Sequence, residues 1–308
     1  MGLRRDCGLV VTYADLFEYY RKQDPTIFVS LQALKAMKGD AVLPYAGEIL
    51  RFLDHRKGED PFRLYAERSQ ELIELQRRFE ETGSYPVSRY ADVQPVGRGR
   101  YNASLLLSFV TTYHRFEILQ QLVRFLEGPT EGPRRLLAVG VGTGYEIKLA
   151  YDYLVGWEVV AFDASRESVQ YAADLLSFFG YSAECLRCGQ FPLEKGDGLE
   201  RYQDSFGKVV LCEILEHLEK PEAALARLHT VLHPRGKLFL TMAINIAQED
   251  HVYLYSTISQ ARSQVTRHGW KVLHELVTPV TVLPFTEEER ERVFKKGNYI
   301  CVAGKATG

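Results

Sequence analysis

With 308 residues, of which 46% are hydrophobic and 25% charged, the chain is long enough for one large core plus a smaller accessory region. A formal net charge of -2 and the lack of any long lysine or arginine run exclude a surface that tracks phosphates, so nucleic acid is not an expected partner. No apolar stretch approaches the roughly 18 residues that a membrane-spanning helix needs, and five scattered cysteines are typical of reduced thiols. We therefore expect a cytoplasmic protein with no membrane partner.

The first part of the chain shows only helical periodicity. In five segments apolar residues recur at spacings of three and four, which predicts amphipathic helices, and no convincing strand pattern lies between them. We assign residues 1–130 to a helical cap or lid on this basis, and a homodimer formed through it stays open. The expected helices are residues 16–23, 26–37, 46–55, 62–81 and 104–126.

After a Gly/Pro break at residues 131–133, short apolar runs alternate with helical segments. This alternation is typical of a doubly wound, mostly parallel sheet with helices on both faces. Residues 131–308 are therefore predicted to form an open α/β domain. The expected strands are residues 134–140, 157–163, 182–188, 207–213, 236–242, 270–280 and 298–306, and the expected helices are residues 145–154, 166–179, 221–232, 256–268 and 286–293.

The first expected strand runs into a glycine-rich turn, and the second ends on an acid. Gly140, Gly142 and Gly144 allow a sharp backbone turn and the close approach of a ligand. Asp163 lies 19 residues beyond Gly144, where a carboxylate can accept hydrogen bonds from both ribose hydroxyls. The dinucleotide pattern G-x-G-x-x-G is not met, because Tyr145 occupies the place of the third glycine. The two features indicate a nucleoside-containing cofactor and disfavour a nicotinamide oxidoreductase.

The turn G-x-G-T-G-x-E resembles the first motif of the class I S-adenosylmethionine-dependent methyltransferases. The later segment DSFGKVVLCEILEHLEKPEAALARLHTVLHPRGKLFLTM is similar to the fourth strand, helix and fifth strand of that family. The resemblance covers about residues 135–241 and implies a Rossmann-like sheet with S-adenosyl-L-methionine as cosubstrate. It places the three glycines and Glu146 near the methionine moiety and Asp163 on the ribose. Gln190 and Phe191 stand where the family usually has an acid for the adenine, and they could bind and stack on that ring.

The motif C-E-I-L-E-H, from Cys212 to His217, admits two interpretations. If the segment is helical, Glu213 and His217 lie four apart on one face, a spacing that suits a divalent metal with His251 as a third ligand. In the other interpretation Glu213 lines the cofactor cleft and His217 packs or caps without a metal. We favour the second interpretation and expect no metal.

Two polar clusters are expected at the substrate. The first is AINIAQEDHVYLY, residues 243–255, which follows the fifth strand, where class I methyltransferases usually admit the acceptor. The second lies in the last helical segment of the cap. His251 is the leading candidate for general base, with Asp250 beside it, and Tyr113 and His114 are the second candidates. The residues expected to contact the substrate are Tyr101, Arg115, Asn245, Gln248 and Tyr253.

The alternative for the first cluster is a loop whose Asx and Gln side chains only satisfy backbone groups. Both clusters otherwise resemble those of bacterial natural-product methyltransferases, including C-methyltransferases of small 2-oxo acids. This implies methyl transfer to a small molecule in secondary metabolism. A second reaction stays open: in azetidine-2-carboxylate synthases of the same fold, the cofactor's own α-amino group attacks its γ carbon and methylthioadenosine leaves. A protein that binds the cofactor without turnover is the remaining alternative.

Overall fold

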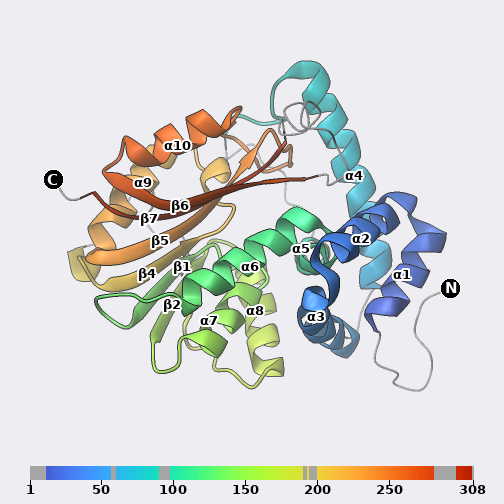
Figure 1. The fold of residues 1–308 in the computed structure, drawn as a ribbon, viewed down its shortest axis with the longest axis horizontal. Coiled ribbons are helices and arrows are strands. Elements are labelled where there is room, and N and C mark those ends of the chain that lie inside the picture. Colours follow the sequence, from blue (N-terminus) through green and yellow to red (C-terminus); the bar gives the residue numbers. More distant parts are fainter. Residues whose placement is uncertain are drawn as a thin grey trace.

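The computed structural model describes residues 12–56, 60–89, 98–189, 193, 200–280 and 296–306, with the side chains of residues 98–100 outside this description. It shows a group of helices at one end of the molecule and a sheet covered by further helices (Figure 1). The expected helix at residues 286–293 and the two candidate adenine contacts, Gln190 and Phe191, lie outside the described residues. None of the described helices has the length and apolar character that crossing a membrane would require.

Six α-helices of the described chain precede the sheet, and the first five form the cap (Figure 1). Two of them, α2 and α4, begin with an Asp-Pro pair. The carboxylates of Asp24 and Asp60 accept hydrogen bonds from the first free N–H groups of these helices, and the proline that follows needs no donor there. The cap helices are α1 Tyr13–Gln23, α2 Pro25–Lys38, α3 Leu43–His55, α4 Pro61–Thr82 and α5 Arg98–Thr111.

The segment 104–126, expected as one helix, is divided at Thr112. α5 ends at Thr111 and α6 spans Tyr113–Glu127, because Thr112 has an extended backbone with φ -125° and ψ 140°. The hydroxyls of Ser108, Thr111 and Thr112 bond back to carbonyl oxygens of the preceding turn, which competes with the regular helix pattern. The expectation of a single helix is wrong here, and the break gives α6 a direction of its own.

The sheet has seven strands in the order β3-β2-β1-β4-β5-β7-β6. β7 runs antiparallel to both of its neighbours, and every other pair is parallel. The predicted doubly wound α/β fold is thus confirmed. The strands are β1 Arg135–Val139, β2 Glu158–Asp163, β3 Leu186–Cys188, β4 Phe206–Leu211, β5 Leu232–Ile244, β6 Trp270–Pro279 and β7 Gly297–Lys305, and the helices between them are α7 Tyr145–Tyr153, α8 Arg166–Phe178, α9 Pro221–Val231 and α10 Ile258–Thr266.

Helices cover both faces of the sheet. α6, α7 and α8 lie on one face, and α9 and α10 lie on the other (Figure 1). The apolar core under α6 continues into the cap, since one cluster joins Leu31 and Phe109 to Phe116, Leu136 and Ile300. The division of the chain into two domains at residue 130 stays a prediction, but α6, on the cap side of that position, packs against the sheet.

A buried lysine links the end of α6 to the sheet. Lys208 of β4 is 1% exposed, and its ammonium donates hydrogen bonds to the carbonyl oxygens of Phe125 (2.7 Å), Leu126 (2.6 Å) and Gly128 (2.9 Å). These carbonyls belong to the last turn of α6, where no intrahelical donor remains and the helix dipole favours a cation. Burial lowers the pKa of Lys208 to about 8, so the charged form still predominates at neutral pH.

Replacing Lys208 by Met should therefore lower the free energy of unfolding by about 2–4 kcal/mol, because the buried carbonyls lose a charged donor. Lys237→Met is the matched control, since Lys237 makes a single exposed bond to Pro129 O (2.8 Å) and should cost less than about 1 kcal/mol. Urea denaturation followed by circular dichroism measures both values. Equal losses in the two variants would contradict the role of Lys208.

Candidate active site

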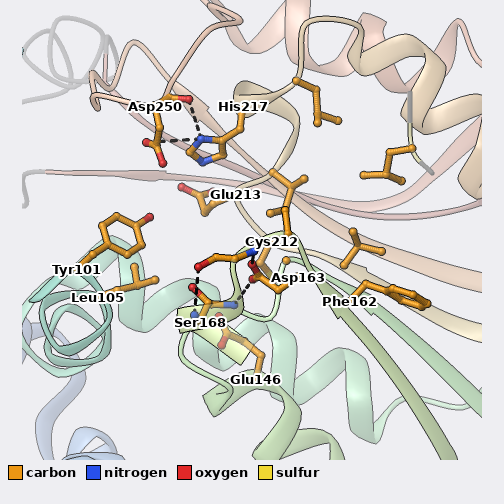
Figure 2. A pocket seen from close by; sticks show the side chains of 18 of the residues that line it. Tyr101, Leu105, Glu146, Phe162, Asp163, Ser168, Cys212, Glu213, His217 and Asp250 are labelled. Carbon is orange, nitrogen blue, oxygen red and sulfur yellow. Dashed lines mark hydrogen bonds and ion pairs between the residues drawn. The ribbon is translucent and has the colours of Figure 1, made fainter. Parts of the chain in front are cut away.

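A cavity of about 360 Å³ lies at the carboxyl ends of β1, β2 and β4, where ligands bind in open α/β sheets. Tyr101 and Leu105 of α5 and Arg115 of α6 line it from the cap side. Figure 2 shows Asp163 and Glu146 at one end, His217 and Asp250 at the other, and Glu213 between them. The cavity therefore brings together residues from both parts of the chain.

The glycine turn between β1 and α7 has the left-handed backbone that its residues predict. Gly140 and Gly144 both have φ of +81°, which glycine adopts without strain. A Cβ on Gly140 would lie 2.1 Å from Ile214 Cδ1, and a Cβ on Gly144 would lie 2.6 Å from Ala172 Cβ. Gly140 and Gly142 line the cavity, as expected for the cofactor side. Gly144 does not, because it is the point of closest packing between the turn and α8.

Asp163 lies in the cavity wall at the end of β2. Its carboxylate accepts hydrogen bonds from Gly142 N (3.0 Å) and Ser165 N (2.7 Å), which fix its orientation beside the glycine turn. A carboxylate has about four acceptor positions, so both oxygens can accept further hydrogen bonds from a ligand. This geometry fits the expected ribose contact, which stays a prediction.

Glu213 follows β4 and connects three other elements. Its carboxylate accepts hydrogen bonds from Thr241 Oγ1 of β5 (2.6 Å) and Asn298 Nδ2 of β7 (2.7 Å), and it lies 3.8 Å from Arg115 Nη1 of α6. Its φ of +53° is left-handed, an unfavourable backbone for a residue with a side chain. Strain of this kind occurs at sites where function requires one orientation. Glu213 lines the cavity, and its role at the cofactor stays a prediction.

Two other ionisable residues predicted in this region are Glu146 and Arg115, and both are largely buried. Burial raises the pKa of the Glu146 carboxyl above its usual range, although the Arg115 charge opposes the shift. Arg115 is nearly buried, and its guanidinium lies 4.8 Å from the Phe109 ring centroid. Both residues line the cavity, and burial makes the Glu146 carboxyl easier to protonate than an exposed one.

The loop after β5 is held by the cap. Gln76 of α4 donates to Asn245 O (3.0 Å) and accepts from Ala247 N (2.9 Å), and buried Arg68 forms an ion pair with Glu249. Asn245 has φ of +52°, and its side chain donates to Ser256 O (2.9 Å). Asn245 thus makes the kind of backbone contact that the alternative interpretation describes and does not line the cavity, and its expected contact with the substrate stays a prediction.

The predicted general base, His251, does not line the cavity. It is fully buried, and burial lowers its pKa to about 3, which makes it a weak base at neutral pH. The imidazole that lines the cavity is that of His217, whose Nδ1 lies 2.9 Å from Asp250 O and 3.6 Å from Asp250 Oδ1. Asp250 and Gln248 line the cavity as expected.

The remaining predicted residues lie apart from the cavity, with one exception. Tyr113 lies under the Lys38 ammonium, 5.0 Å from its ring centroid, and Tyr253 packs on Tyr255 with ring centroids 4.9 Å apart. Burial lowers the pKa of His114 to about 3. Neither candidate base of the cap, Tyr113 or His114, lines the cavity, whereas Tyr101 does.

The residue pattern does not predict that Arg68 and Gln76 hold the loop after β5. It also does not predict that His217 lines the cavity. Arg68 and Gln76 lie in a charged, regularly amphipathic helix, and nothing in their spacing distinguishes them from solvated residues. The sequence pattern around His217 predicts only packing, capping or metal binding, and its place in the cavity wall follows from a short 3₁₀ turn, Leu215–His217, after β4. Backbone geometry, which the residue pattern does not carry, decides these positions.

The family model described as a methyltransferase domain matches residues 112–275, which make up more than half of the chain. No protein among the curated sequences matches the chain. Solved structures are similar at low identity. A putative methyltransferase from Bacillus halodurans C-125 is 15% identical, with a TM-score of 0.47, and the match covers 61% of this chain and 99% of the other.

A Burkholderia thailandensis 1,6-didemethyltoxoflavin-N1-methyltransferase, solved with 1,6-didemethyltoxoflavin and S-adenosylhomocysteine, is 18% identical, with a TM-score of 0.45 and coverage of 70% of this chain and 93% of the other. The match to the family model establishes the family of this chain. This chain belongs to the methyltransferase domain family and has the class I methyltransferase fold. Its cosubstrate is S-adenosylmethionine, and it is accordingly an S-adenosylmethionine-dependent transferase.

The glycine turn allows a matched stability test. Gly144→Ala and Gly156→Ala both place a side chain at a left-handed backbone, since Gly156 has φ of +77°, but nothing lies within 4 Å of a Cβ on Gly156. The left-handed conformation should cost both variants about 1–2 kcal/mol. Gly144→Ala should lose about 1–3 kcal/mol more, because its methyl group overlaps Ala172 of α8. Chemical denaturation measures the difference, and equal losses would rule out close packing at Gly144.

Proposed function

We propose that this protein transfers the methyl group of S-adenosylmethionine to a small polar acceptor in natural-product metabolism. The observation that carries the proposal is the two-ended cavity. One end has the glycine turn and Asp163, and the other has Gln248, Asp250 and His217. A volume of about 360 Å³ is near the lower limit of about 300 Å³ for ligand cavities, so little room remains for an acceptor beside the cofactor.

In this proposal the cofactor lies with its ribose on Asp163 and its methionine moiety beside Gly142, Glu146 and Arg115. Arg115 would pair with a carboxylate, because a guanidinium binds carboxylates with paired hydrogen bonds. Its ion-pair distance to Glu213 of 3.8 Å is long enough to leave the guanidinium available to a ligand. The sulfonium methyl group would then point toward the end of the cavity that holds Gln248 and Asp250.

The acceptor end supports a base other than the predicted one. Methyl transfer is an in-line displacement, so positioning contributes much of the rate and a base removes the acceptor proton. His251 is buried behind the wall, whereas the Asp250 carboxylate lines the cavity beside His217. We propose Asp250 as the proton acceptor, with Gln248 and Tyr101 holding the acceptor molecule. A 2-oxo acid is the acceptor class we favour, because its C3, next to the keto group, must lose a proton to a base before the resulting enolate attacks a methyl group.

One observation supports the cyclisation alternative. Glu146 has a pKa raised by burial and lies in the region proposed for the methionine amino group. A carboxylate of that kind could take the proton as the α-amino nitrogen attacks the γ carbon and breaks its bond to sulfur. Methylthioadenosine would leave with the sulfur electron pair, and the amino acid ring would close. No acceptor is needed in this reaction.

The two reactions are separated by their products. The protein is incubated with S-adenosylmethionine alone and with a panel of small 2-oxo acids, and the nucleoside products are measured by liquid chromatography and mass spectrometry. Methyl transfer predicts S-adenosylhomocysteine only when an acceptor is present. Accumulation of methylthioadenosine without an acceptor would reject methyl transfer and support cyclisation.

Asp250→Asn then tests the assignment of the base. We expect kcat to fall about 10²- to 10⁴-fold while the affinity for S-adenosylhomocysteine stays within about twofold, because Asp250 lies at the acceptor end. Asp54→Asn is the control, since Asp54 is an exposed acid on α3. An unchanged kcat in Asp250→Asn would remove Asp250 from the proton transfer.

A further inference from the structure

Three potential metal ligands converge behind the acceptor end of the cavity. Glu216 and His217 lie in the turn after β4, and His251 lies in the loop after β5. One donor atom from each residue lies within 4.8 Å of the other two. In a tetrahedral site with ligand bonds of about 2 Å, donor atoms are roughly 3.3 Å apart, so small side-chain movements would bring these three to one ion.

Backbone carbonyl groups hold one ring nitrogen of each histidine in the group. His217 Nδ1 lies 2.9 Å from Asp250 O, and His251 Nδ1 lies 2.8 Å from Ile246 O. Because a carbonyl oxygen only accepts, each Nδ1 carries the hydrogen and each Nε2 keeps a free lone pair. Metal-binding histidines are usually held in this way by an acceptor on the other ring nitrogen. His251 Nε2 is buried and has no hydrogen-bond partner.

The Glu216 carboxylate also lacks a hydrogen-bond partner at one of its two oxygens. Glu216 is fully buried, its Oε1 accepts a hydrogen bond from Ala243 N (3.2 Å), and its Oε2 has no partner. No lysine or arginine of the described chain forms an ion pair with Glu216. A buried carboxylate without a cation is costly, and so is a buried imidazole nitrogen without a donor. A single cation between the two would satisfy both groups.

We propose that Glu216, His217 and His251 form a binding site for one divalent transition-metal ion of the Zn²⁺ class. Two imidazole nitrogens with one carboxylate oxygen suit Zn²⁺ or Fe²⁺, whereas Mg²⁺ and Ca²⁺ prefer oxygen ligands throughout. His217 also lines the cavity, so the ion would lie in its wall with a coordination position directed toward the acceptor. The site does not depend on methyl transfer being the reaction.

The ligand set differs from the one that the sequence suggested. The helical spacing paired Glu213 with His217, but the segment forms a 3₁₀ turn limited to Leu215–His217. Glu213 is instead occupied by Thr241 and Asn298 on the sheet. The neighbouring Glu216 takes its place in the group of three.

In the alternative, Glu216 and His251 form an uncharged pair and bind no metal. Burial and the neighbouring Glu213 charge raise the pKa of the Glu216 carboxyl well above its usual range. A protonated Glu216 held beside a neutral His251 would need no cation. The two accounts therefore differ in whether the folded protein binds a stoichiometric ion.

The test uses the full chain, dialysed against a chelator and then titrated with Zn²⁺ by calorimetry, with bound metal counted by mass spectrometry. The wild type should bind one ion per chain. Glu216→Gln and His251→Ala should each weaken Zn²⁺ binding at least 10- to 100-fold. His274→Ala is the control, because His274 is an exposed histidine on β6 and its loss should leave binding unchanged.

Co²⁺ titration of the wild type gives a readout that needs no variant. Coordination by two imidazoles and a carboxylate in a four- or five-ligand site produces visible absorption bands, which should saturate at one equivalent and disappear when Zn²⁺ displaces Co²⁺. A wild-type protein that binds no stoichiometric ion overturns the proposal. So does tight binding that both site variants retain, since the ion would then lie elsewhere.

Discussion

The shape of the cavity depends on the hydrogen bonds that the Glu213 carboxylate accepts. This carboxylate lies where β4 ends, and its oxygens meet groups from β5, β7 and α6 through Thr241, Asn298 and Arg115. A parallel sheet has its strand ends at one edge, but nothing in the strand pairing fixes how the loops beyond that edge lie. The Glu213 carboxylate fixes the loop after β4, because its hydrogen bonds to Thr241 of β5 and Asn298 of β7 are lost if it moves. The left-handed backbone of Glu213 is the local cost of this arrangement.

The cap completes the cavity by fixing the loop after β5. Gln76 binds that loop from two sides, through Asn245 O and Ala247 N, and buried Arg68 holds Glu249. At the opposite end, Lys208 binds the last turn of α6 to the sheet. The cap is thus joined to the α/β part by directed polar contacts as well as by a shared apolar core. Acceptor binding at Gln248 and Asp250 is expected to depend on these contacts.

Much of the fold could be predicted because buried parallel strands contain short apolar runs, as in β1, β2, the end of β4 and the second half of β5. The glycine turn and Asp163 could be placed because their requirements are local. The division of the last cap helix at Thr112 could not, since it arises from hydroxyl groups that bond to the backbone. The choice between Glu213 and Glu216 and the burial of His251 depend on turn geometry and on residues about 35 positions apart in the chain, which residue spacing does not encode.

We propose that the cavity binds S-adenosylmethionine with its ribose on Asp163 and the acceptor at the Asp250 end. The most direct measurement is the dissociation constant of S-adenosylhomocysteine, determined by calorimetry for the wild type, Asp163→Ala and Asp250→Asn. Loss of hydrogen bonds to a charged carboxylate, worth about 1.5–3 kcal/mol, predicts roughly 10- to 150-fold weaker binding for Asp163→Ala. Asp250→Asn should bind like the wild type. Unchanged affinity in a folded Asp163→Ala variant, or an equal loss in both variants, would contradict the account.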